Sequence, residues 1–132
     1  MNTMKKLMML ALSGVLLWSC SKSGLGDNGL TEEEMDYQKL TQMGADIKDY
    51  AKNKACAGDE CRVMSMGSKA CGGPTQFIVY SVGKVDEKVL TQKINDYTEY
   101  ERQLNIKYSR ISDCAMIAIP TVDCVNGLCV TK

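Results

Sequence analysis

Two stretches of the chain repeat apolar residues at steps of three and four, the spacing of one face of an α-helix. The first is expected to begin at Thr31, because Thr31 and Glu34 have the spacing of a capping box, and to end near residue 52. The second is expected from about residue 85 to 105, with Glu99, Glu101 and Arg102 facing water. The two stripes are Leu40, Met43, Ile47, Tyr50 and Ala51, then Val89, Leu90, Ile94, Tyr97, Tyr100 and Leu104.

Shorter runs have the composition of β-strands. Residues 77–82 are rich in β-branched and aromatic side chains, and another short strand is expected to begin at Val63 and Met64. Residues 115–119 are apolar and strand-like until Pro120 ends the run. The dipeptide Asn126-Gly127 lies between two further strand-like segments, and it is a strong signal for a two-residue hairpin turn.

Together these elements predict an α+β fold. We expect a small disulfide-stapled domain in which two helices pack on a mainly antiparallel sheet that ends in a C-terminal β-hairpin. The strand–helix–strand order from residue 77 to 119 also allows one parallel pair, so the order of the strands stays open.

The first 20 residues have the pattern of an export signal. Two lysines near the start precede an apolar run at residues 7–17, which is too short to span a bilayer because that takes about 20 apolar residues. The run ends in Leu17-Trp18-Ser19-Cys20, which resembles a bacterial lipobox. The resemblance implies cleavage before Cys20 and acylation of its thiol and new amino group. An ordinary signal peptide cut near Ser19 is the alternative.

The lipobox divides the chain into three expected parts. Residues 1–19 form the lipoprotein signal peptide, 20–30 a glycine-rich flexible tether, and 31–132 a cysteine-rich α+β domain. Two of the 16 basic residues leave with the signal, so 14 remain against 16 acidic residues, a net charge of −2. This balance lacks the basic patch of a nucleic-acid-binding protein. The expected membrane contact is therefore the lipid on Cys20 alone.

Six of the seven cysteines remain in the exported domain, which predicts three disulfides. A two-residue hairpin turn places Cys124 opposite Cys129 with their Cα atoms about 4.5 Å apart, just inside the range of a disulfide. The cysteines at the two ends of the polar turn 56–61 are expected to close it in the same way, and the last two then pair with each other. The expected disulfides are Cys124–Cys129, Cys56–Cys61 and Cys71–Cys114.

Metal-binding uses of the sulfur side chains are the alternatives. The cysteines of the pairs 56–61 and 124–129 would offer four thiolates to zinc, but such sites belong to reducing compartments. Met64 and Met66 would offer soft ligands to copper(I), although alternation along a strand gives the same spacing. The prediction is therefore no metal and no cofactor.

The absence of histidine from the sequence limits the possible catalytic chemistry. It excludes catalytic triads with a histidine base, histidine metal ligands and histidine pH switches. A carboxylate pair, as in glycoside hydrolysis, and a serine–lysine arrangement remain. Asp113, beside Cys114, is the one carboxylate that we single out, and a cap or turn explains it better than catalysis. No catalytic residue is predicted.

The glycine-rich loop at residues 67–76 is the candidate binding site. Gly67 and Gly72 have the spacing of a phosphate-binding loop, but Gly73 and Pro74 occupy the positions of the required lysine and hydroxyl. Flanked by strands and held by Cys71, the loop can present groups at little ordering cost. The alternative is that its glycines only form a turn. The predicted binding residues are Lys69, Gly72, Gly73 and Gln76.

Several motifs taken together resemble those of a known group of proteins. The motifs GSKACGGP, IVYS, SDC and NGLCV lie within residues 56–130. They resemble a family of small, cysteine-rich bacterial secreted proteins without an assigned activity. The resemblance implies export and a cysteine-rich architecture, and it implies no catalytic residue.

These observations predict a non-catalytic binding module of the bacterial cell envelope. The lipid on Cys20 would hold it in a membrane, with the outer membrane expected. Its partner would be an unknown protein or an envelope polymer, and inhibition of a foreign hydrolase would be a special case. The alternatives are a carboxylate-dependent envelope enzyme and a purely structural envelope lipoprotein.

Overall fold

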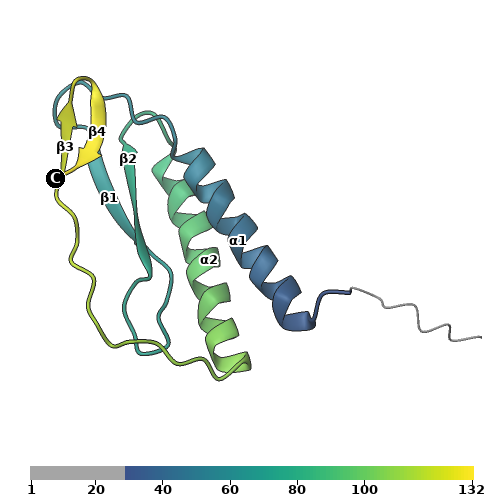
Figure 1. Ribbon diagram of the computed structural model, residues 1–132. Helices are drawn as coiled ribbons and strands as arrows, with labels where there is room; N and C mark the ends of the chain where they lie inside the picture. The colour runs from purple at the N-terminus through teal and green to yellow at the C-terminus, as the bar shows by residue number, and fades with distance from the viewer. Residues whose placement is uncertain (1–28) are drawn as a thin grey trace, which may run out of the picture.

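The computed structural model describes residues 29–132 (Figure 1). The predicted signal peptide, the lipobox with Cys20, and the tether as far as residue 28 lie outside the described residues. The elements in chain order are α1 (Glu32–Tyr50), β1 (Cys61–Met66), β2 (Gln76–Ser81), α2 (Glu87–Lys107), β3 (Val122–Val125) and β4 (Leu128–Thr131). This confirms the predicted α+β class with its C-terminal hairpin. Neither helix is long and apolar enough to cross a membrane.

Helix α1 begins where the sequence predicted, at a complete capping box. The Thr31 hydroxyl oxygen accepts from Glu34 N at 3.2 Å, and the Glu34 carboxylate accepts from Thr31 N at 2.7 Å. Two N–H groups at the helix start are thereby satisfied. The predicted stripe faces the core, where Leu40 and Ile47 are buried.

Helix α2 begins and ends two residues later than predicted. Asp86 is the N-cap, and its carboxylate accepts from the N–H groups of Lys88 and Val89. The predicted apolar stripe is confirmed except at Val89, which is 39% exposed. Val89 lies at the edge of the stripe, while its neighbour Leu90 is completely buried.

Strands β1 and β2 form an antiparallel pair in which Val63 faces Val79, and the helices pack against this pair (Figure 1). Gly44 of α1 lets the helices approach closely, because a Cβ there would lie 3.3 Å from the Tyr97 ring of α2. The buried core residues are Leu40, Ile47, Ala51, Met66, Ile78, Tyr80, Leu90, Ile94, Tyr97 and Leu104. One core therefore lies between the helices and β1–β2.

Strands β3 and β4 form a second, separate antiparallel pair. Their turn is the predicted Asn126-Gly127, with φ of 51° and 77°, as the two central residues of a type I′ turn require. The predicted register is also confirmed, since Cys124 faces Cys129. Backbone bonds from Cys56 N to Gly127 O and from Cys129 N to Lys54 O, both 2.9 Å, join the hairpin to the segment after α1.

The predicted strand at residues 115–119 is wrong. The backbone has no turn, bend or ladder partner from residue 110 to 121, and it runs as an extended connection from α2 to β3 (Figure 1). No parallel pair forms among the described strands. The apolar composition was read correctly as extended chain, but a strand also needs a neighbouring strand with free backbone groups.

Candidate functional site

The three disulfides join Cys56 to Cys124, Cys61 to Cys129, and Cys71 to Cys114. The last pair is as predicted, and the predicted Cys56–Cys61 and Cys124–Cys129 pairs are wrong.

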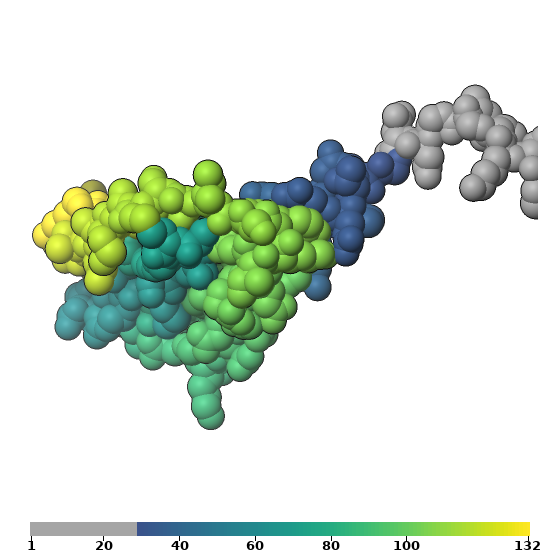
Figure 2. All heavy atoms as spheres, turned by 90° about the horizontal axis from the view of Figure 1, so that it is seen from below, coloured from purple at the N-terminus to yellow at the C-terminus, as the bar shows by residue number. Residues whose placement is uncertain are grey.

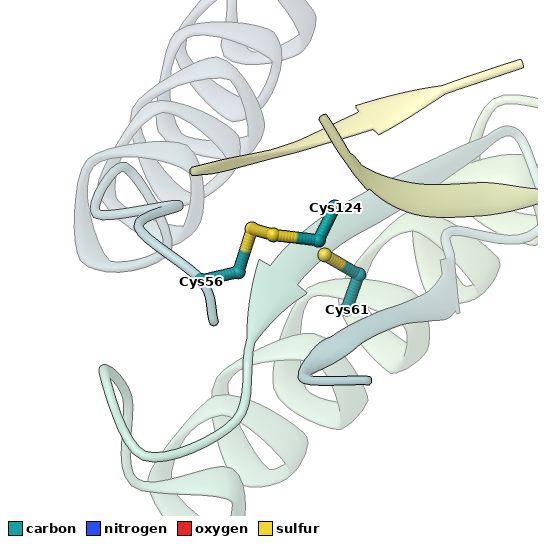
Figure 3. Close-up of side chains that lie close together, drawn as sticks. All are labelled: Cys56, Cys61 and Cys124. Carbon is teal, nitrogen blue, oxygen red and sulfur yellow. A yellow bond between two sulfur atoms is a disulfide. The ribbon is translucent and has the colours of Figure 1, made fainter. Parts of the chain in front are cut away.

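The cross-strand register explains the two errors. Cys124 and Cys129 lie side by side on one face of the hairpin, as directly opposed residues in an antiparallel pair do. That face lies against the segment that carries Cys56 and Cys61, so each hairpin cysteine bonds across to it. Figure 3 shows the Cys56–Cys124 bond with Cys61 beside it. The sulfur atoms of Cys56, Cys61 and Cys124 all lie within 4.8 Å of one another. The four cysteines of the zinc alternative thus do come together, but as two disulfides they offer no thiolate to a metal.

The 67–76 loop is cradled by one face of α2. Glu101 accepts from Ser68 N at 2.7 Å and from the Thr75 hydroxyl at 3.1 Å. Residues one turn away on either side of Glu101 also bond to the loop: the Thr98 hydroxyl accepts from Gly67 N, and the Asn105 amide donates to Ser68 O. The expectation that Glu101 faces water is therefore wrong.

The sequence gives only a weak signal for these contacts between α2 and the loop, here called the cradle. Thr98, Glu101 and Asn105 recur at helical spacing, but polar residues at that spacing are the usual pattern of a solvated helix face. Only the position of the loop over α2 distinguishes the cradle from such a face.

Lys69 of the predicted site is used inside the molecule. Its side chain is only 16% exposed, and its Nζ atom lies 2.6 Å from Asp113 Oδ1 and 2.8 Å from Ala115 O. The Lys69 ammonium lowers the pKa of the Asp113 carboxyl. A general acid would need a raised pKa, so the lowered pKa argues against that role for Asp113. The two short contacts of Lys69 tie the loop to residues 113–115, which is a structural role.

The other three predicted binding residues divide into two groups. Gln76 is half-buried and its amide donates to the Tyr97 hydroxyl at 3.3 Å, which anchors the start of β2. Gly72 and Gly73 are exposed, have φ of 101° and 85°, and have nothing within 4 Å of where a Cβ would be. The loop therefore presents Gly72 and Gly73 outward and uses its polar side chains to hold itself in place.

The connection at residues 111–121, here called the strap, is the most exposed apolar segment that the structure describes. Ile111 is 97% exposed, Met116 86% and Ile119 72%. Figure 2 shows the strap lying across the 67–76 loop on the face seen there. Sequence reasoning missed its importance because it assigned residues 115–119 to the sheet.

The strap is held to the loop at one end. Besides the Cys71–Cys114 disulfide and the Lys69–Asp113 ion pair, Cys71 N donates to the Ser112 hydroxyl at 3.0 Å. At the other end Thr121 O accepts from Lys132 N, beside β3. The exposed glycines of the loop and the apolar side chains of the strap thus form one continuous, fixed surface, here called the loop–strap surface.

A second polar cluster joins the start of α1 to the end of α2. The Asp36 carboxylate accepts from Lys107 Nζ at 2.7 Å, from the Tyr108 hydroxyl at 2.7 Å and from the Tyr100 hydroxyl at 2.8 Å. These donors, Lys107 foremost, hold the pKa of Asp36 well below its usual range. The carboxylate is fixed in its charged form with its acceptor sites occupied, which suits a structural clamp between the helices.

Arg110 extends this clamp. Its guanidinium stacks 3.8 Å from the centre of the Tyr37 ring, while its buried Nη2 atom lies 3.7 Å from Glu33 Oε1, beyond hydrogen-bond distance. Such cation–π stacking stabilises by about 1 to 2 kcal/mol when it is partly shielded from water. The cluster therefore fixes the residues from which the strap departs.

Comparison with known proteins adds no relative: no family model matches the chain, and no curated protein or solved structure is similar to it.

Proposed function

We propose that the chain is a lipid-anchored, non-catalytic binding module of the bacterial cell envelope, and that the loop–strap surface recognises its partner. The partner is a protein or an envelope polymer. The supporting observation is the strap itself, an exposed apolar segment fixed by a disulfide and by the Lys69–Asp113 ion pair.

The exposed apolar side chains of the strap favour it as the contact region. Exposed apolar residues are common singly, but a run of them on one segment is typical of an interaction site. Because the segment is already fixed, little conformational entropy is lost when a partner binds. Inhibition of a hydrolase fits this arrangement as a special case, since a fixed extended segment can occupy a substrate cleft.

The binding proposal is tested by titrating the purified mature domain against envelope polymers and against hydrolases. Saturable binding without turnover is expected, and turnover would instead support the carboxylate-dependent enzyme. Met116→Ser should weaken binding by about tenfold or more, a loss of about 1.4 kcal/mol. Met35→Ser on α1 is the matched control, because Met35 is 53% exposed and lies outside the loop–strap surface. Equal binding by both variants would contradict the assignment.

The anchor is tested separately. The wild-type chain should partition with membranes and carry the added mass of lipid, while Cys20→Ala should carry none. One acyl chain binds membranes only marginally and two or more hold firmly, so the acylated protein should resist a salt wash. A wild-type protein without added lipid mass would contradict the lipoprotein proposal and leave the binding proposal standing.

A further inference from the structure

The strap has the composition of an unprotected edge strand. Residues 115–119 are five consecutive exposed apolar residues, and no charged residue occurs between Asp113 and Asp123. Natural proteins usually protect such edges with lysine, proline or a covering loop, because an exposed apolar edge pairs with other chains. Here the first such device along the strap is Pro120.

The backbone of the strap also lacks partners. Within residues 29–132, the N–H and C=O groups of residues 116–119 make no hydrogen bond, and the chain there is extended without a bend. Those groups are strong donors and acceptors that are nearly always paired in folded proteins or solvated by water. An added strand would pair them.

The two carbonyls of the strap that do have partners show which way its backbone groups face. Ala115 O accepts from Lys69 Nζ, and Thr121 O accepts from Lys132 N, so both point toward the body of the domain. Along an extended chain the backbone groups of alternate residues point to opposite edges. Residues 115 and 121 are six apart, so the odd-numbered residues between them face inward. Met116 and Ala118 therefore face outward.

We propose that the strap pairs with the strap of a second copy of this chain, as antiparallel strands centred on Ile117. Met116 of one copy then faces Ala118 of the other, and each such pair exchanges two hydrogen bonds through its outward N–H and C=O groups. The proposal uses the surface named in the proposed function, and the last experiment below separates the two.

Three features of the strap favour a second copy of the chain as the strand that pairs with it. A strand paired antiparallel with itself is self-complementary and closes with two-fold symmetry. With the centre at Ile117, Asp113 faces Thr121, so no like charges meet. The inward edge is bound to Lys69 at one end and to Lys132 at the other, so it does not take a third copy. Pro120 is even-numbered and has no N–H, so it ends the hydrogen-bonded ladder on the outward edge.

The expected association is weak in solution. A pairing of so few residues belongs to the transient interfaces, which bury less than about 1,200 Å². Two copies anchored in one membrane would meet at a much higher effective concentration, which strengthens such a contact without new interactions.

The first test is sedimentation of the chain from residue 20 onward, with Cys20→Ala to prevent acylation, since the core and all three disulfides lie beyond that point. A concentration-dependent dimer is expected, weakened at least about tenfold by Ala118→Pro, which removes an outward N–H. Ile119→Pro is the matched control, because it puts a proline in the same strap but removes an N–H that faces the other edge. A monomer at up to about 1 mM, or a dimer that Ala118→Pro leaves intact, would overturn the proposal.

The second test uses a synthetic peptide of residues 111–121 with serine in place of Cys114. It should dissociate the dimer, and N-methylation at both Met116 and Ala118 should abolish this effect. N-methylation at Ile117 and Ile119 should not, because their N–H groups face the other edge. Equal loss with both peptides would show that the assigned edge is wrong.

The outcomes also distinguish this inference from the proposed function. A chain that stays monomeric but binds an envelope partner through Met116 refutes self-pairing only. A dimer that Ala118→Pro disrupts, in a chain whose partner binding does not depend on the strap, refutes only the assignment of the recognition surface.

Discussion

The two antiparallel pairs of this molecule are stabilised by different means. Strands β1 and β2 carry Met66, Ile78 and Tyr80 into a core covered by both helices. In β3 and β4, Cys129 is the only buried residue, while Val125, Leu128 and Val130 are exposed. The hairpin instead has two disulfides to the segment that carries Cys56 and Cys61.

The difference shows how a small domain can hold an element that buries little apolar surface. An isolated two-stranded hairpin is marginally stable at best in water, so the β3–β4 pair needs support from elsewhere in the molecule. Here two disulfides attach the hairpin, which contributes little to the hydrophobic core. Loss of the hairpin crosslinks is therefore expected to open the hairpin first, and loss of core packing to open the helices and β1–β2 first.

The largest effect should follow from replacing Cys56, Cys61, Cys124 and Cys129 with alanine. On the chain-entropy model, either crosslink alone closes a loop of 68 residues. Once it is present, the other crosslink closes only a short loop made of the segments 56–61 and 124–129. Removing both should lower the free energy of unfolding by about 7 kcal/mol, and removing either alone by about 3 kcal/mol. Urea denaturation measures the values, and hydrogen exchange should show the hairpin amides losing protection first.

The control is removal of the third disulfide by Cys71→Ala with Cys114→Ala. It should cost about 4 kcal/mol and leave the hairpin amides protected. The losses in the free energy of unfolding from the two single removals should not add up to the loss from removing both. If they did, the two hairpin crosslinks would act independently, and the second would not be closing a short loop.

The next largest effect tests the other half of the comparison. Leu90→Ala should lower the free energy of unfolding by about 3 to 4 kcal/mol, because Leu90 is fully buried among core side chains and its loss leaves a cavity. Val89→Ala, one residue earlier and 39% exposed, should cost less than about 1 kcal/mol. Thermal or urea unfolding would check both, and equal losses would contradict the placement of the core.

A smaller effect is expected at the loop that connects β1 to β2. Gly67 has φ of 88°, and a Cβ there would overlap the Thr75 hydroxyl and meet the Glu101 carboxylate. Gly67→Ala should therefore cost about 3 kcal/mol, from backbone strain and crowding together. Gly73→Ala has a similar φ but open space around it, so it should cost only about 1 kcal/mol. The difference between the two variants in urea denaturation measures the cradle formed by α2.

The smallest effect concerns pH and the helix clamp. The folded pKa of Asp36 is lowered, foremost by Lys107 and then by Tyr108 and Tyr100. Its contribution is therefore fully present above the unfolded pKa of about 4 and is lost as the pH falls toward the lower folded pKa. Asp36→Asn should lower the free energy of unfolding at pH 7. It should also make that free energy fall less steeply between about pH 4 and pH 2 than in the wild type. A variant whose acid unfolding curve parallels the wild type would contradict the clamp.

Most of the secondary structure could be predicted from the sequence because its determinants are local. The capping box at Thr31, the helical stripes and the Asn126-Gly127 turn each depend on residues a few positions apart. The hairpin register followed from its turn in the same way, so Cys124 was correctly placed opposite Cys129.

The candidate site was predicted less well. The 67–76 loop and its disulfide to Cys114 were found, but Lys69 and Gln76 were expected to face a partner. Both side chains bond within the molecule instead. A polar residue in a loop has the same appearance in the sequence whether it contacts its own chain or another one.

By itself the sequence determined the class of fold, the start of α1 and the hairpin turn, because backbone preferences and side-chain spacing act over a few residues. The tertiary structure alone decided which cysteines bond, that Glu101 holds a loop, and that residues 115–119 form an unpaired strap. Each of these depends on which surface lies opposite a residue in space. A cysteine that faces another across a hairpin is still bonded elsewhere when a third sulfur lies at the right distance, and an apolar run becomes a strand only if a free edge lies beside it.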